Sequence, residues 1–276
     1  MRNPDLKAPT GVDVYALYEE AVQDPVADTR WFARVFREVH GVDARRLRED
    51  FCGTFRTCCA WVKRHRENRA VGVDIDSEPL DYGRRRHLAK LTPGQRRRLA
   101  LLRRNVLEVD SPRVDLVVAC NFSYWTFKTR DVLRRYFRAA FRSLRPRGLL
   151  LVDATGGSAG HDPHLEWRFH RSRTGRRRFT YFWDQKTYNP ITQESRFAIH
   201  FKLPDGIRVR DAFLYDWRLW SIPELREVMR EAGFRETYVY WEGDDPRTGG
   251  GNGMFTRAEA AEGCESWIAF VAGKKG

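Results

Sequence analysis

The sequence lacks the features of membrane and secreted proteins. It has no run of eighteen or more apolar residues, and its N-terminus carries no apolar segment of the kind found in a secretory signal. Its cysteines are few, odd in number and without the spacing of metal ligands: Cys52, Cys58, Cys59, Cys120 and Cys264. We therefore expect a cytoplasmic protein with free thiols, no membrane partner and no bound metal.

Internal repeats, low-complexity tracts and linkers are also lacking. A chain of 276 residues without such boundaries suits one large α/β domain, or one domain with an inserted lobe. Apolar residues make up 42% of the chain and aromatic residues 13%, which is enough to fill a sizeable core.

Acidic residues are fewer than basic ones, 37 against 50, so the net charge is +13. Arginines cluster at 84–86, 96–98, 103–104 and 176–178. Such a field would attract the phosphates of RNA. The clusters are dispersed, however, and no basic tail or known nucleic-acid module accompanies them, which favours solvated helix faces. RNA therefore remains an alternative partner.

The stretch from Leu47 to Asp76 carries the strongest functional signal. A predicted strand ends in Glu49 and Asp50, a turn of small residues follows at 52–54, and a helical pattern leads to a second strand that ends near Asp74. Such a unit is half of a doubly wound nucleotide-binding sheet, in which the terminal acid binds the two ribose hydroxyls. The competing interpretation of Asp74 is a helix-capping acid before Ser77.

The turn of this unit lacks the three glycines of a dinucleotide site. Phe51 and Phe55 occupy the space through which a backbone would approach a pyrophosphate. The turn therefore suits an adenosine ligand without phosphates, and S-adenosylmethionine is such a ligand.

Strands and helices alternate through five predicted strands, which implies a parallel sheet. Three strands of alternating pattern follow, at 179–183, 196–203 and 207–217, and predict an antiparallel insert that forms a lid. A capping box at Ser221 resumes the main fold, and two strands at 237–241 and 266–271 flank a glycine-rich loop. We expect a core at 1–156, an insert at 157–220 and a completing segment at 221–276.

Four segments together resemble the class I S-adenosylmethionine-dependent methyltransferases, especially a bacterial branch that acts on small molecules. They are the acidic turn at 49–54, the strand at 71–76, the strand at 114–121 and the stretch at 144–150. The likeness extends by topology over 221–271. It implies a Rossmann-like, doubly wound, seven-stranded mixed sheet whose last strand is antiparallel, with an antiparallel lid after the fifth strand.

The resemblance also implies a site for S-adenosylmethionine. Asp74 would hold the ribose, Ile75 would pack on the adenine, Asn105 would lie beside the adenine amino group and the Val106 amide beside a ring nitrogen. Asn105 could equally be a plain turn residue. The other expected cofactor residues are Tyr18, Glu49, Cys52, Gly53, Thr54, Asn121 and Phe122. Strand alternation lets only one of Glu49 and Asp50 face the site.

Methyl transfer from a sulfonium depends mainly on alignment of the nucleophile with the methyl carbon. The aromatic residues expected at the acceptor are Tyr124, Trp125, Trp183 and Trp217, although packing of the lid would explain them too. His200 is the candidate base, with Asp153, His161 and Asp216 as lesser candidates. An amine that binds in its neutral form would need no strong base.

Three functions follow from this sequence. We favour methyl transfer to the nitrogen or oxygen of a small-molecule acceptor. An RNA methyltransferase is the second possibility, and a cofactor-binding scaffold without activity, suggested by the unusual Phe51, is the third. The segment Asn121-Phe122-Ser123-Tyr124 lacks the prolines of the Asn-Pro-Pro-Tyr motif, which disfavours methylation of base amino groups. No oligomeric state is predicted.

Overall fold

Two β-sheets organise the computed structural model, which describes residues 2–3, 5, 9–172, 174–247 and 249–276. The larger sheet has eight strands in the order β11-β10-β12-β5-β4-β1-β2-β3. Its strands are β1 (Arg46–Asp50), β2 (Arg69–Asp74), β3 (Leu99–Arg103), β4 (Val114–Ala119), β5 (Leu144–Gly156), β10 (Glu236–Asp244), β11 (Gly251–Arg257) and β12 (Trp267–Lys274). The first five are parallel, and β12, β10 and β11 add antiparallel pairs.

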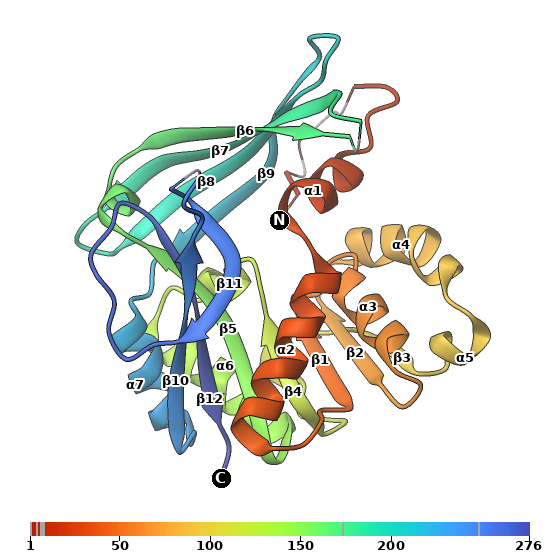
Figure 1. The fold of residues 1–276 in the computed structure, drawn as a ribbon, viewed down its shortest axis with the longest axis vertical. Helices are drawn as coiled ribbons and strands as arrows, with labels where there is room; N and C mark the ends of the chain where they lie inside the picture. Colours follow the sequence, from red (N-terminus) through yellow and green to blue (C-terminus); the bar gives the residue numbers. More distant parts are fainter. Residues whose placement is uncertain (1, 4, 6–8, 173, 248) are drawn as a thin grey trace.

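Helices cover both faces of the parallel strands, as the alternating strands and helices predict (Figure 1). Leu116 and Val118 of β4 pack with one group of helices, whereas Val117 packs with the other. The first group is α2 (Pro25–His40), α3 (Arg56–Arg64) and α4 (Ser77–Arg86), and the second is α6 (Arg130–Ser143) and α7 (Ile222–Ala232). Burial on both sides explains why β4 is almost entirely apolar.

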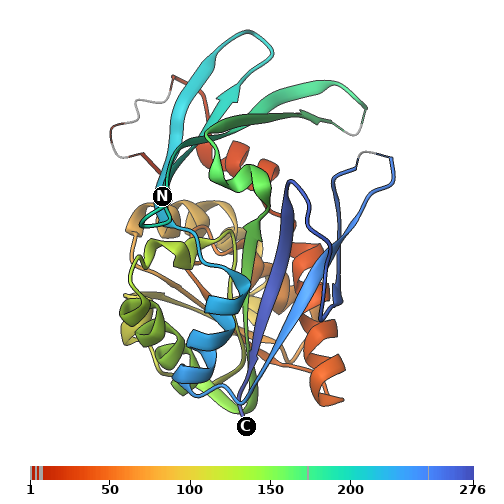
Figure 2. The ribbon, with the colours of Figure 1, turned by 90° about the vertical axis from the view of Figure 1, so that its left-hand side faces the viewer.

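The smaller sheet is the predicted antiparallel insert. It comprises β6 (His164–Arg171), β7 (Arg177–Asn189), β8 (Glu194–Lys202) and β9 (Arg208–Arg218), joined in that order. Figures 1 and 2 show it lying over one end of the larger sheet. Helix α1 (Val14–Val22) packs beneath it, because Val14 and Ala21 share a core with Phe179, Ile199 and Phe213.

Two strands differ from the sequence prediction. The glycine-rich segment, predicted as a loop, forms β11, which pairs with β10 and makes the sheet eight-stranded rather than seven-stranded. Strand β6 was left out of the prediction, although Leu165, Trp167 and Phe169 alternate with polar residues as in a strand. All three apolar residues are exposed. Pairing with β7 supplies the hydrogen bonds that the sequence pattern does not reveal.

The remaining short elements are α5 (Pro93–Arg96), η1 (Leu88–Lys90), η2 (Val106–Glu108), η3 (Ser123–Thr126) and η4 (Ser158–His161). Among the residues described, no helix has the length and apolar character needed to cross a bilayer.

Candidate active site

Two adjoining cavities lie where the parallel strands end beneath the insert. The smaller, about 220 Å³, is formed around the β1–α3 turn and the end of β2, and we call it the turn cavity. The larger, about 470 Å³, lies under the insert sheet, and we call it the insert cavity. Six residues line both cavities: Tyr18, Gln23, Cys120, Asn121, Tyr215 and Trp217. A group bound in one cavity can therefore reach a group bound in the other.

In the turn between β1 and α3, every second residue from Phe51 to Phe55 has a left-handed backbone conformation. Phe51, Gly53 and Phe55 have φ angles of 55°, 50° and 50°. For the two phenylalanines this conformation costs about 1–2 kcal/mol each. The Phe51 ring recovers energy by packing at 5.8 Å from Phe127 and 5.7 Å from Tyr136, centroid to centroid. Phe51 thus has the left-handed conformation that glycine favours, while its ring lies against Tyr136 of α6 and Phe127, which follows η3.

Phe55 is fully buried, and a glycine on α4 makes room for it. A Cβ atom on Gly83 would lie 2.5 Å from the Phe55 ring and 2.5 Å from the Thr54 carbonyl oxygen. The Phe55 ring therefore fits against α4 because residue 83 has no side chain.

Asp74 closes the turn from the end of β2. Its Oδ2 accepts the Gly53 amide at 2.7 Å and its Oδ1 accepts the Asp76 amide at 2.9 Å. Burial raises the pKa of this carboxyl. Ile75 follows it on the cavity wall, with 60% of its surface exposed. A carboxylate beside an uncovered apolar side chain is suited to a ribose diol beside a planar base.

Glu49 and Asp50 point to opposite faces of the sheet, as strand alternation requires. Asp50 is fully buried, is paired with Arg48 at 2.8 Å, and accepts the Tyr136 hydroxyl at 3.1 Å on the α6 side. Glu49 accepts the Cys58 amide at the start of α3 at 3.0 Å, and burial raises its pKa to about 7. Both residues line the turn cavity, but the Asp50 carboxylate is bound within the core network.

The structure brings most of the predicted cofactor residues together. Those lining the turn cavity are Tyr18, Glu49, Cys52, Gly53, Thr54, Asp74, Ile75 and Asn121. Asn105 and Val106 are not among the residues that line it. The Asn105 side chain accepts the Leu107 amide at 3.1 Å and caps η2, and Val106 is buried in the core.

The turn after β4 is held by Asp153. Asn121 and Phe122 have φ angles of 57° and 55°, and their amides donate to the Asp153 carboxylate at 2.5 Å and 2.9 Å. Burial raises the pKa of Asp153 to about 7. Phe122 lines the insert cavity rather than the turn cavity, where it stacks on Trp125.

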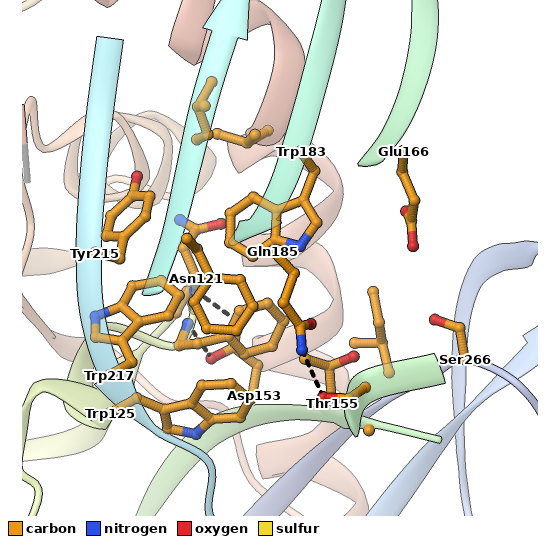
Figure 3. Close-up of a pocket in the computed structure, with 18 of the residues that line it drawn as sticks. Asn121, Trp125, Asp153, Thr155, Glu166, Trp183, Gln185, Tyr215, Trp217 and Ser266 are labelled. Atoms are coloured by element: carbon orange, nitrogen blue, oxygen red, sulfur yellow. Dashed lines mark hydrogen bonds between the residues drawn. The ribbon is translucent and has the colours of Figure 1, made fainter. Parts of the chain in front are cut away.

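Aromatic side chains form one side of the insert cavity. Figure 3 shows Trp125, Trp183, Tyr215 and Trp217 gathered near Asp153, with Glu166, Thr155 and Ser266 across from them. Tyr215 and Trp217 lie 4.2 Å apart, centroid to centroid. Of the four aromatic residues predicted to bind substrate, Tyr124 alone does not line this cavity. It is fully buried and donates its hydroxyl to the Asp153 carbonyl oxygen at 2.7 Å.

The insert cavity is acidic although the chain is basic. Its carboxylates come from five separate parts of the fold: Asp24, Asp28, Asp153, Glu166, Glu242 and Glu265. Its basic residues are Arg168 and His164. The Arg168 guanidinium lies 4.5 Å from the Tyr181 ring centroid and donates to the Ala21 carbonyl at 2.6 Å, so it is held in the wall.

His200, the predicted base, is not brought to either of these cavities. Its Nε2 lies 3.1 Å from Asp184, and its Nδ1 accepts the Asp211 amide at 2.7 Å, on the outer face of the insert. The reason is the two-residue period of β8, because Phe197 and Ile199 face the insert cavity and His200 faces away. Sequence reasoning missed Asp28, Glu166 and Glu242, since each stands on an element whose neighbours are known only from the fold.

Similarity to known proteins agrees with this architecture. Residues 52–150 match a family model described as a methyltransferase domain. No curated protein matches the sequence. Among solved structures, an S-adenosylmethionine-dependent methyltransferase from Clostridium acetobutylicum shares 15% identity at a TM-score of 0.64, with 95% of this chain and 98% of that chain covered.

Two further structures match over almost their whole length. One is CalS10, an amino pentose methyltransferase from Micromonospora echinaspora, with 17% identity, a TM-score of 0.64 and coverage of 97% and 99%. The other is the sugar N-methyltransferase KedS8 from Streptoalloteichus, with 20% identity, a TM-score of 0.62 and coverage of 100% and 98%. Residues 52–150 thus form a methyltransferase domain, and the whole chain has the fold of class I S-adenosylmethionine-dependent methyltransferases.

Proposed function

We propose that this methyltransferase transfers the methyl group of S-adenosylmethionine to the nitrogen of a small, positively charged amine. The observation that carries the proposal is the insert cavity. It is lined by carboxylates and aromatic rings, and it joins the turn cavity through a shared wall.

The turn cavity has the groups that the methyl donor needs. Asp74 and Ile75 suit the ribose and the adenine, and the buried Tyr15 hydroxyl, which has no hydrogen-bond partner among the described residues, supports a polar ligand here. Bound there, S-adenosylmethionine would supply an activated methyl group. Tyr18 and Asn121, in the shared wall, would align the acceptor with it.

The insert cavity fits a small cation. Its volume of about 470 Å³ is in the range of small-molecule sites. Carboxylates stabilise an ammonium group by charge, and aromatic faces add about 0.5–2 kcal/mol each. CalS10, an amino pentose methyltransferase, and KedS8, a sugar N-methyltransferase, have this fold and support nitrogen as the acceptor atom.

The same charges disfavour RNA. The polyanionic backbone of RNA would have to approach six carboxylates that line the cavity. The net charge of +13 is the argument for RNA, so total RNA is one of the acceptors to be tested. The scaffold alternative is weakened because Phe51, which suggested it, has the left-handed backbone conformation that a glycine at this position would favour.

A methyl-transfer assay tests the proposal. The purified protein, S-adenosylmethionine and one acceptor at a time are incubated, and formation of the demethylated cofactor is followed. The acceptors are small primary amines from ethanolamine to an amino sugar and a linear polyamine, together with matched hydroxyl compounds and total RNA. We expect turnover with amines and none with the hydroxyl compounds. Turnover with RNA or hydroxyl compounds alone would refute the amine assignment.

A further inference from the structure

We propose that Asp28 is the catalytic base of this site and takes a proton from the ammonium group of the acceptor before methyl transfer. This inference rests on the proposed function and extends it to a residue on α2.

The Asp28 carboxylate does not cap its helix and interacts with α2 only through the helix dipole. Asp24 caps the N-terminus of α2 by accepting the Ala27 amide at 3.0 Å. Asp28 lies in the first turn and lines the insert cavity, and its side chain forms no hydrogen bond or ion pair with a residue that the structure describes. A carboxylate that neither caps a helix nor pairs with a cation is available to a ligand.

The neighbouring buried carboxylates are occupied. Glu49 accepts the Cys58 amide, and Asp153 accepts the amides of Asn121 and Phe122. These amides stabilise the charged forms and fix both side chains. Asp28 lines the same cavity, and neither of its oxygens is bonded to a residue that the structure describes, unlike its two neighbours.

The surroundings of Asp28 bring its pKa to about 7, and burial is the main cause. The charged and titratable groups that interact with Asp28 come from β1, α3, the turn after β4, β5 and the cap of α2. They are Asp24, Glu49, Arg56, Cys120 and Asp153. Of these, Arg56 alone favours the charged form, and its guanidinium is held by the Glu19 carbonyl at 2.7 Å. A base is most effective when its pKa lies near the working pH.

The aromatic hydroxyls at the junction cannot replace it. Burial raises the pKa of Tyr18 to about 12 and that of Tyr215 well above its ordinary value. Both hydroxyls therefore stay protonated at neutral pH and can donate hydrogen bonds but not accept the acceptor's proton.

The step balances as follows. An N–H bond of the ammonium acceptor breaks, an O–H bond forms on Asp28, and the nitrogen regains its lone pair. That pair then forms the N–C bond to the methyl group, while the C–S bond breaks and its electrons return to sulfur. The proton on Asp28 is then released to solvent.

The test compares Asp28→Asn and Asp28→Glu with Glu38→Gln, an acid-to-amide change at an exposed position on the same helix. Thermal unfolding and calorimetric binding of S-adenosylmethionine first establish that each variant is folded. At pH 7 we expect Asp28→Asn to lose about 100-fold in kcat/KM for an amine. Asp28→Glu should retain most activity, and Glu38→Gln should equal the wild type.

The pH profile separates a base from a structural residue. Wild-type kcat/KM should show an inflection near pH 7, whereas that of Asp28→Asn should rise without one as the free amine becomes abundant toward its own pKa, near 10. Wild-type turnover of amines together with an unchanged rate and profile in Asp28→Asn would overturn this inference and leave the proposed function standing.

Infrared difference spectra between the wild type and Asp28→Asn report the carboxyl directly, whatever the acceptor proves to be. A protonated carboxyl band that disappears near pH 7 supports the inference. A residue already ionised at pH 5 overturns it. If the wild type methylates no amine, the proposed function fails, and this measurement still decides whether Asp28 is poised as a base.

Discussion

Replacing Asp74 by alanine should weaken binding of S-adenosylmethionine by roughly 100-fold. Each Asp74 oxygen already accepts one backbone amide, from Gly53 and from Asp76, and so has about one acceptor position left. Two ribose hydroxyls can occupy these positions. Hydrogen bonds to a charged group contribute about 1.5–3 kcal/mol each, so the loss is about 3 kcal/mol at the lower limit.

Isothermal titration calorimetry with S-adenosylmethionine measures this loss, and thermal unfolding without ligand shows that the variant is folded. Asp74→Asn retains one carbonyl oxygen and should lose about tenfold, an intermediate value. The control is Asp81→Ala on the exposed face of α4, where the carboxylate pairs with Arg84 at 2.6 Å, and it should bind like the wild type. A folded Asp74→Ala protein with a Kd within twofold of the wild type would refute the ribose assignment.

Three further predictions concern stability, and urea unfolding measures each of them. Gly83→Ala should lower the free energy of unfolding by about 1–3 kcal/mol, because its methyl group would lie 2.5 Å from the Phe55 ring. Adding Phe55→Leu should recover part of this loss, and an unchanged stability of Gly83→Ala would contradict the packing. Arg48→Leu should lower the free energy of unfolding by about 3–5 kcal/mol, because it leaves the Asp50 carboxylate buried and unpaired. The double variant Arg48→Leu with Asp50→Asn should be more stable than Arg48→Leu alone, and equal stability of the two would exclude this cause. Burial raises the pKa of Glu49 to about 7. The stability that Glu49 contributes is therefore complete below its unfolded pKa, near 4.3, and is lost as pH rises toward 7. Glu49→Gln should reduce this fall in the free energy of unfolding with pH, and an unchanged slope would refute the prediction.

The alternating core was predictable because its signals are local. The strands β1 to β5, the helices between them and the capping box before α7 each depend on periodicity, caps or breakers within a few residues. Strand β11 was not predictable in this way, and β6 was left out although its residues alternate between apolar and polar. Each depends on hydrogen bonds to a partner strand, and neither has an apolar stripe on a buried face.

Most residues around the turn cavity were predictable as neighbours, and most of those around the insert cavity were not. Asp74 and the turn at 52–54 lie within one βαβ unit, whose geometry follows from chain order. Asn105 and Tyr124 do not line the cavities to which they were assigned, because the Asn105 side chain caps η2 and Tyr124 of η3 is buried in the core. His200 stands one position out of phase, and on a strand that single step selects the opposite face.

From the sequence alone came the doubly wound core, the inserted lid and the class of cofactor. These features depend on the order and spacing of residues along the chain, which can be read without knowing any long-range contact. Only the tertiary structure decided the character of the insert cavity. Its carboxylates stand on α2, β5, β6, β10 and the segment before β12, far apart in the chain, and packing of the insert over the sheet brings them around one space. A chain with a net charge of +13 thereby encloses a cavity lined by carboxylates, because net charge depends on composition alone, whereas the charge of a cavity depends on which residues the fold places around it.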